Sequence, residues 1–158
     1  MKVALRTIGL AGLIAGTLDL GYVIGFYAIK FPAVSAAQIV QAIAAGAIGR
    51  EAAGKGGLGT VALGFVLHFV IAFGAAAVFY ALSRRLCVMI AWPVVSGALF
   101  GVAAWLVMNL VVLPLSATPP KVFPAPIWPW ILAAHVLCVG LPIAFVVRRC
   151  DSARAGAR

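Results

Sequence analysis

The sequence predicts an all-α membrane protein, a polytopic four-helix bundle with an extra short amphipathic helix in the first outer loop. Hydrophobic residues make up 65% of the 158 residues and charged residues only 9%, whereas a typical soluble domain is about half apolar and about a quarter charged. Four apolar runs reach the ~20 residues that a helix needs to cross a bilayer. We therefore expect a single transmembrane domain over residues 1–158, with spans at about 8–29, 60–82, 90–113 and 127–147.

None of the four runs alternates apolar and polar residues with a period of two, so helices are expected rather than barrel strands. The first run follows Lys2 and Arg6, and a cleaved secretory signal is the alternative for it. Its apolar length exceeds that of a signal peptide, and no A-x-A-like cleavage site follows it. An uncleaved first span is the preferred interpretation.

The first loop, residues 30–59, contains a helical pattern of its own. Ser35 follows Pro32 and can cap the start of a helix. Apolar residues then recur at helical spacing: Ile39, Val40, Ile43, Ala44 and Ile48. The pattern predicts an amphipathic helix on the outer surface, either as a lid packed over the bundle or as a substrate gate.

Prolines mark two further places in the chain. The third loop contains five of them and is expected to be extended and fairly stiff: Pro114, Pro119, Pro120, Pro124 and Pro126. Pro142 lies inside the fourth span, where it should kink the helix or free a backbone carbonyl.

The net charge of +9 is interpreted as an orientation signal. The basic residues flank the apolar runs, whereas a nucleic-acid-binding domain would gather them on one folded face. The N-terminus, the second loop and the C-terminal tail hold eight of the 12 Lys and Arg. Both termini are therefore expected on the cytoplasmic side of a bacterial inner membrane. The predicted partners are the lipid bilayer and, as further possibilities, a second copy or other membrane helices, with no nucleic acid.

Among the 12 Lys and Arg and the 3 Asp and Glu, only Asp19 falls inside a predicted span. Each remaining span contributes one notable polar residue, namely His68, Asn109 and His135 in chain order. At ~1.5 Å of rise per residue, Asp19, His68 and His135 lie roughly 20–24 Å from the nearest cytoplasmic arginine, and Asn109 lies nearer the outer side. The sequence predicts that these four residues form an intramembrane polar cluster.

Small residues share the polar face in the first three spans. Gly12 and Gly16 lie on the face of the first-span carboxylate, and Gly97 and Gly101 lie on the face of the third-span amide. Because small residues let membrane helices approach closely, these four glycines are predicted to mediate helix packing. Residues 21 and 25 form a second G-x-x-x-G pair in the first span.

The cluster has three interpretations. It is a hydrogen-bonded network that holds the helices in register, or a pathway coupled to protons or ions, because carboxyl and imidazole groups away from water can exchange protons near neutral pH. The third is a ligand set, in which the two histidines hold a b-type haem or join the carboxylate around a metal. The chain has only two histidines and no paired ligand motif, so no cofactor or metal is expected.

Hydrolytic chemistry has no support in the sequence. No serine stands in a G-x-S-x-G context. The cysteines, Cys87, Cys138 and Cys150, show no metal-type spacing. Cys138 lies one turn after His135, but a buried apolar thiol is normally inert. The protein is therefore not expected to be an enzyme.

Several short motifs occur in a recognisable order: Gly12-Leu13-Ile14-Ala15-Gly16, the region of His68, Pro114-Leu115, Thr118-Pro119-Pro120, and a later helix with His135. In this order the chain resembles the YagU-like family of uncharacterised bacterial inner-membrane proteins and related small four-span proteobacterial proteins. The resemblance implies a four-helix inner-membrane protein without an assigned activity, loosely associated with acid tolerance. The positions of this chain that match the family's motifs are His68, Thr118, Pro119, Pro120 and His135. Asp19 and the outer loop depart from the family pattern.

The predicted function is an integral inner-membrane protein of unknown activity. Its intramembrane Asp/His cluster is expected to act in proton- or ion-coupled transport or in acid stress. One alternative is a non-enzymatic accessory or structural membrane subunit whose G-x-x-x-G faces bind partner helices. The other is a membrane protein that binds a b-type haem or a metal.

Overall fold

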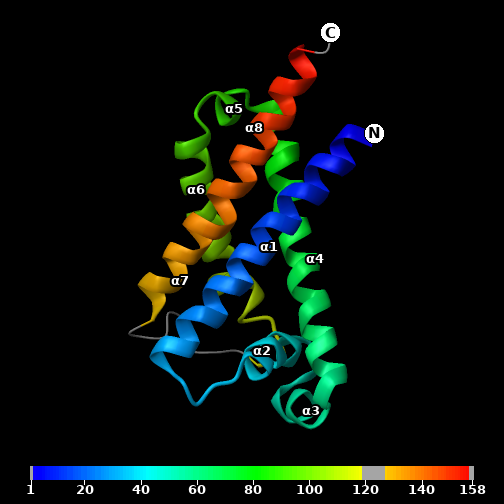
Figure 1. Ribbon diagram of the computed structural model, residues 1–158, viewed down its shortest axis with the longest axis vertical. Helices are drawn as coiled ribbons and strands as arrows, with labels where there is room; N and C mark the ends of the chain where they lie inside the picture. The colour runs from blue at the N-terminus through cyan, green and yellow to red at the C-terminus, as the bar shows by residue number, and fades with distance from the viewer. Residues whose placement is uncertain (1, 119–126, 157–158) are drawn as a thin grey trace.

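Four long helices dominate the computed structural model, which describes residues 2–118 and 127–156 (Figure 1). Four helical segments are long and apolar enough to cross a membrane: Lys2–Lys30, Gly57–Arg85, Pro93–Val112 and Trp128–Ser152. Within the described ranges the structure contains no strand. These observations confirm the predicted all-α helical bundle and are those of a multi-pass membrane protein.

The helices follow one another along the chain with short connections. The first span is α1 (Lys2–Lys30), the second is α4 (Gly57–Arg85), and the third is α6 (Pro93–Val107) continued by the π-helix η1 (Met108–Val112). The fourth consists of α7 (Trp128–Ala134), the π-helix η2 (His135–Gly140) and α8 (Leu141–Gly156). Three shorter helices connect the spans: α2 (Ala36–Ile48), α3 (Arg50–Lys55) and α5 (Val88–Ala91).

The third span begins later than the sequence predicted. The prediction placed its start at residue 90, but residues 88–91 form the separate helix α5, and α6 begins at Pro93. Trp92 between them has φ −119° and ψ 66°. The ring of a proline clashes with a helical conformation in the residue before it, so the chain leaves the helix at Trp92 and restarts with proline in the first turn.

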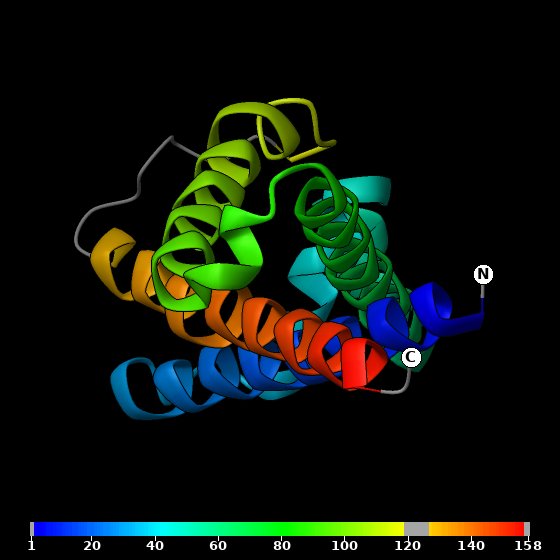
Figure 2. The same ribbon diagram turned by 90° about the horizontal axis from the view of Figure 1, so that it is seen from above.

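Both chain ends and α5 lie at one end of the bundle, here called the terminal end, while α2 and α3 lie at the opposite, far end (Figure 1). α1 packs between α4 and α8, and α6 packs against η2 and α8. Viewed along the bundle, α4 and α6 lie on the same side of the layer formed by α1 and α8 (Figure 2).

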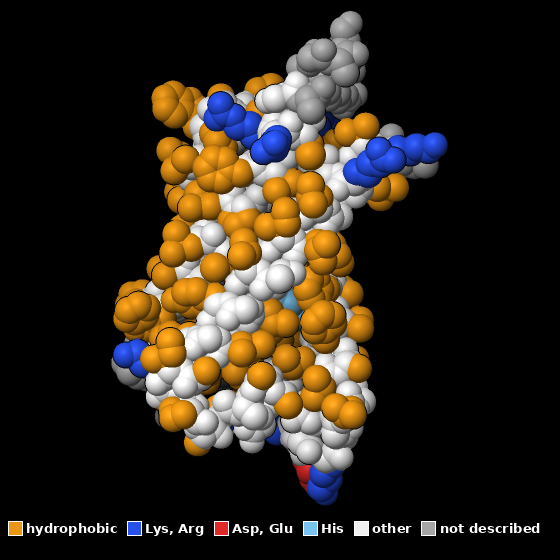
Figure 3. Space-filling view, in the orientation of Figure 1, with side chains coloured by type: hydrophobic (Ala, Val, Ile, Leu, Met, Phe, Trp, Pro, Cys, Tyr) orange, Lys and Arg blue, Asp and Glu red, His pale blue; other side chains and the backbone are white. Residues whose placement is uncertain are grey.

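The main hydrophobic core lies between α1, α4 and α8. Phe79 of α4 is fully buried, and its ring meets that of Phe100 of α6 edge-on, with 5.1 Å between ring centroids. Alanines of α1, α4 and α8 and two branched residues of α8 complete the core: Ala11, Ala15, Ala76, Ala144, Ile143 and Val147. The outer surface is covered largely by apolar side chains, with Lys and Arg near the ends (Figure 3), which is the pattern of a lipid-facing surface.

The short helix predicted in the first loop is present as α2. The Ser35 hydroxyl accepts a hydrogen bond from the backbone N–H of Gln38 (3.2 Å), and the Gln38 side chain accepts one from the N–H of Ser35 (2.8 Å). This reciprocal capping box satisfies two of the unpaired donors at the helix start. One face of α2 is buried against the bundle, through residues Ile39, Val40, Ala44 and Ala45.

Two glycines of α6 bring the third and fourth spans into close contact at η2. A Cβ atom built on Gly140 would overlap the carbonyl of Gly97, and one built on Gly101 would lie 2.6 Å from the carbonyl of His135. The π-helical segment ends just before Pro142. Because proline has no N–H, the regular i to i−4 pairing is broken there, and the wider turn of η2 is a local adjustment to that loss.

The predicted stiff loop between the third and fourth spans cannot be compared in full. Pro119, Pro120, Lys121, Pro124 and Pro126 lie outside the described residues. The part that is described, residues 113–118, forms turns. Ser116 donates a hydrogen bond from its hydroxyl to the carbonyl of Leu113 (2.8 Å), so the helix end is continued by a turn rather than by extended chain.

The close crossing of α6 and η2 predicts a marked difference between two glycine-to-alanine substitutions. Gly140→Ala should lower the free energy of unfolding by about 1–3 kcal/mol, because the added methyl group overlaps the backbone of α6. Gly74→Ala in α4 is the control, since nothing lies within 4 Å of its built Cβ atom. Thermal unfolding in mild detergent measures both. Equal stability of the two variants would contradict the close approach.

Candidate functional site

Glycines of α1 allow α4 to approach its backbone. A Cβ atom on Gly12 would overlap Phe73, and one on Gly16 would lie about 3 Å from Phe69 and Ala72. Neither position can therefore carry a larger side chain without moving α4. The first G-x-x-x-G pair lies at the α1–α4 contact, and this contact brings the Gly16 carbonyl within reach of a side chain on α4.

That side chain is His68, the polar residue of the second span. Its Nε2 lies 2.9 Å from the carbonyl oxygen of Gly16. Since a carbonyl only accepts hydrogen bonds, Nε2 carries the hydrogen and donates it. The imidazole also meets the ring of Phe69 edge-on, with 5.4 Å between ring centroids. His68 thus ties α4 to α1 through one nitrogen, while its Nδ1 makes no hydrogen bond within the described residues.

His135 is held in the opposite way. Its Nδ1 lies 2.9 Å from the carbonyl of Ile131, one turn earlier in the same span, so Nδ1 donates and Nε2 is the nitrogen without a recorded hydrogen bond in the described chain. His135 is also the first residue of η2. Such π-helical turns occur frequently at functional sites.

Asp19 lies one turn beyond Gly16 on α1 and belongs to the same cluster. Its carboxyl interacts electrostatically with both His135 and His68. The Oδ1 atom is buried and has no hydrogen-bond partner among the residues that the structure describes. The ion pairs in those residues are Lys55–Glu51 and Arg84–Asp151, and neither involves Asp19. The structure therefore brings together one carboxyl and two imidazoles from three spans.

The fourth predicted member, Asn109, is engaged elsewhere. It lies in η1, is buried, and donates from Nδ2 to the carbonyl of Trp105 at 2.9 Å, one turn earlier in the same span. Asn109 thereby satisfies a backbone acceptor next to a π-helical turn. Within the described residues it makes no hydrogen bond to Asp19, His68 or His135, so its observed role is local.

Two residues that the sequence prediction did not assign to the site lie beside it. The Cys138 thiol, half-buried in η2, interacts electrostatically with Asp19. Gly140 makes the close approach to Gly97 and Gly101 that holds η2 against α6. The signal for the cysteine was its position one turn after His135. The signal for the glycine was its place two residues before Pro142 in an otherwise apolar span.

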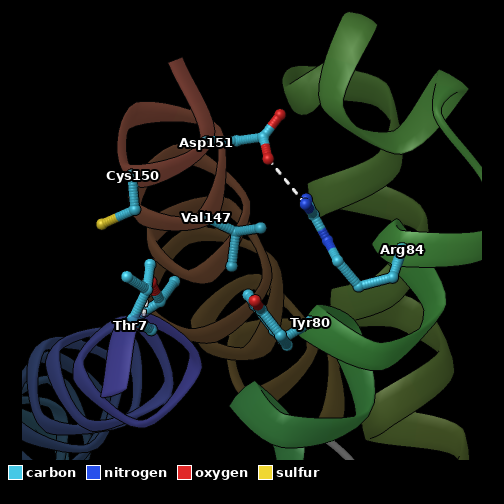
Figure 4. A pocket seen from close by; sticks show the side chains of 7 residues that line it. Thr7, Tyr80, Arg84, Val147, Cys150 and Asp151 are labelled. Carbon is cyan, nitrogen blue, oxygen red and sulfur yellow. Dashed lines mark hydrogen bonds and ion pairs between the residues drawn. The ribbon is translucent and has the colours of Figure 1, made fainter. Parts of the chain in front are cut away.

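The terminal end of the bundle has a separate, smaller feature, a cavity of about 10 Å³ between α1, α4 and α8 (Figure 4). Thr7, Tyr80 and Arg84 line it together with residues of α8. Arg84 Nη1 donates to Asp151 Oδ1 at 2.6 Å, and the guanidinium lies 5.1 Å from the centre of the Tyr80 ring. The volume is about that of one water position, so this feature joins α4 to α8 and does not suit an organic ligand.

The donor set of the cluster does not favour a metal or a haem. Within residues 2–118 and 127–156, no three His, Cys, Asp or Glu side chains are arranged to hold a metal ion. The Nε2 atom of His68 is already engaged with Gly16, so the two histidines do not present matching nitrogens to a shared iron. What the arrangement offers is one carboxyl and two imidazole nitrogens able to accept a proton.

Comparison of the chain with models of known protein families, with curated proteins and with solved structures finds no match. The resemblance to the YagU-like family therefore stays a prediction.

The hydrogen bonds of the two histidines predict opposite neutral tautomers. His68 should carry its hydrogen on Nε2 and His135 on Nδ1, because each of these atoms faces a carbonyl oxygen. Nitrogen-15 NMR of histidine-labelled protein distinguishes the two forms, and His135→Ala assigns the signals. Spectra in which both neutral histidines carry the hydrogen on Nε2 would show that the His135 geometry is wrong.

Proposed function

We propose that this protein moves protons, or couples to their movement, across a bacterial inner membrane through Asp19, His68 and His135. The observation that carries the proposal is the buried Oδ1 of Asp19, which lacks a hydrogen-bond partner in the described residues, in a carboxyl group that interacts electrostatically with two imidazoles. Inside a membrane a carboxyl is stable only when it is protonated or faces a positive charge. Both conditions involve a proton at this site.

The imidazoles supply acceptors for that proton. With Nε2 of His68 and Nδ1 of His135 bound to carbonyls, the remaining nitrogens are His68 Nδ1 and His135 Nε2. A proton that leaves the Asp19 carboxyl for either nitrogen, directly or through one water, produces a carboxylate beside an imidazolium. Opposite charges attract strongly in a low-dielectric environment, so neither charge is left unpaired during the transfer.

The same site is consistent with a role in acid stress. The resemblance to the YagU-like family implies a loose association with acid tolerance, and a proton-exchanging cluster inside the membrane is chemistry suited to that condition. The proposal assigns no bond-breaking reaction and no cofactor to the protein.

The distribution of basic residues supports an orientation for the bundle. The helices that end at the terminal end carry seven basic residues within the described chain: Lys2, Arg6, Arg84, Arg85, Arg148, Arg149 and Arg154. The far end carries three, Lys30, Arg50 and Lys55, of which Lys55 is paired with Glu51 at 2.6 Å. Since Lys and Arg are enriched in cytoplasmic loops, the terminal end is proposed to face the cytoplasm.

A second candidate function, an accessory subunit, is favoured by one surface. Gly21 and Gly25 of α1 are exposed, and nothing lies within 4 Å of a Cβ atom built on either. Unlike Gly12 and Gly16, this G-x-x-x-G pair is available to a partner helix. A protein that purifies from mild detergent as a monomer, with no partner, would count against this candidate.

Proton movement should depend on the carboxyl of Asp19. Purified protein in liposomes with a pH-sensitive dye trapped inside should accelerate proton entry under an imposed pH gradient. Asp19→Asn should reduce that rate to the level of protein-free liposomes, and His68→Ala should lower it, because the acid or its acceptor is removed.

Asp151→Asn is the matched control, because it removes a carboxylate of the terminal end. Its partly exposed ion pair with Arg84 is expected to contribute less than about 1 kcal/mol to stability. It should transport as the unaltered protein does. If protons enter liposomes containing Asp19→Asn as fast as they enter liposomes containing the unaltered protein, the proposed function is wrong.

The orientation has its own test. An alkaline phosphatase fused to the C-terminus should be inactive, because the enzyme acquires activity only outside the cytoplasm. The same enzyme inserted at Gly49, the residue between α2 and α3, should be active. The opposite pattern would reverse the proposed orientation.

A further inference from the structure

The helix α2 lies across the far end of the bundle. Figure 1 shows it beside the far-end half of α4, and Figure 2, seen from the terminal end, shows it beyond the region that the long helices surround. Its buried face packs against α4. It has much less contact with α1. The short apolar helix α2, followed by α3, therefore forms the connection between the first two spans.

The contact between α2 and α4 includes a close approach to the backbone of α2, in addition to the buried apolar face of that helix. A Cβ atom built on Gly64 would overlap the carbonyl of Val40. Ala44, one turn further along α2, is fully buried. Because Gly64 has no side chain, the backbone of α2 can lie closer to α4 than any other residue at this position would allow. Even the methyl group of an alanine would disturb the contact.

Hydrogen bonds hold α2 on two sides. On one side Gln41 donates from Nε2 to the Thr60 hydroxyl (3.1 Å) and to the carbonyl of Gly57 (3.2 Å). On the other side the N–H of Ala117, after the third span, donates to the carbonyl of Gly46 (2.8 Å). These are a few polar contacts at the membrane surface, where water can replace them.

The face of α4 that α2 covers continues to the polar cluster. Thr60, Gly64 and His68 follow one another at intervals of four residues and therefore share one face of the helix. α2 contacts the first two, and His68 is the next residue on that face. Because Asp19 interacts electrostatically with His68 and α2 contacts the two preceding residues of this face, α2 lies on the far-end side of the cluster.

Two glycines with positive φ lie between α2 and the start of α4. Gly49, between α2 and α3, has φ 85°, and Gly57, at the start of α4, has φ 53°. Glycine adopts such angles without a steric penalty and moves between backbone regions more freely than other residues. α2 is also an independently capped helix through Ser35, so it can move as a unit without unfolding.

We propose that α2 is a movable plug that controls the access of water and protons from the far end to Asp19, His68 and His135. The inference rests on the proposed function, because a plug has a role only where the cluster exchanges protons. With α2 seated on Gly64, the cluster is closed to the far-end solution. When α2 moves away, His68 and Asp19 become accessible to it. A permanently packed lid is the competing outcome of the experiment.

The chain contains a reporter for this motion. Cys138 interacts electrostatically with Asp19, whereas Cys87 lies between α4 and α5 and Cys150 lies in the last part of α8, both toward the terminal end. In a Cys87→Ser/Cys150→Ser protein, a charged thiol reagent that does not cross membranes reaches Cys138 only through water. The reagent is added to the far-end side of oriented vesicles, and the rate of labelling is measured.

Gly64→Ala should accelerate labelling about tenfold or more, because overpacking by a methyl group shifts an equilibrium by about that factor. Gly74→Ala, on the same helix with open space around it, is the matched control and should label at the original rate. Gln41→Leu removes the bonds to Thr60 and Gly57 without adding bulk to the backbone contact. It should also accelerate labelling, and it decides the test if Gly64→Ala fails to fold.

Equal labelling of Cys138 in Gln41→Leu and in the unaltered protein would overturn the plug and leave α2 a fixed lid. So would labelling that proceeds only from the terminal side. These results are distinct from those of the liposome assay. Faster labelling in the variants, combined with proton entry that does not depend on Asp19, would retain the movable helix and remove the proposed function.

Discussion

Close approach between helices at glycine positions is the constraint on which the rest of this structure depends. At Gly16 it brings a carbonyl of α1 to 2.9 Å from His68 of α4. At Gly97 and Gly140 it holds α6 against η2. Lipid provides no hydrophobic drive for helices to associate, so packing of this kind and hydrogen bonds between helices must supply the attraction. The polar cluster is a product of these contacts.

The cluster differs from an ordinary structural network in one respect. Each histidine donates one hydrogen bond to a backbone carbonyl, which fixes the ring. The carboxyl oxygen Oδ1 of Asp19 is buried without a partner in the described residues. A network selected only to hold helices together would pair its most polar atom, because an unpaired buried acceptor costs free energy. The unpaired acid favours an exchanging proton over a static network.

The two ends of the bundle are built for different tasks. At the terminal end, the fully buried Phe79 and the ion pair of Arg84 with Asp151 join α4 to its neighbours. At the far end, α2 is held by its buried face of four apolar residues, by the close approach at Gly64 and by a few exposed or partly buried hydrogen bonds. The proposed control of access depends on whether α2 leaves this contact with α4.

The sequence by itself determined the class of fold, the four spans, the capped helix after Ser35 and the isolated position of Asp19, because apolar run length, capping residues and charge are local properties. It also predicted that His68 and His135 lie at the same depth in the membrane as Asp19, since helical rise is regular. Only the tertiary structure decided which polar residues meet. It separated Asn109 from the cluster and shortened the third span at Trp92. It also introduced two π-helical turns and seated α2 on α4. These outcomes depend on helix rotation and on backbone distances between spans, which no single run of residues encodes.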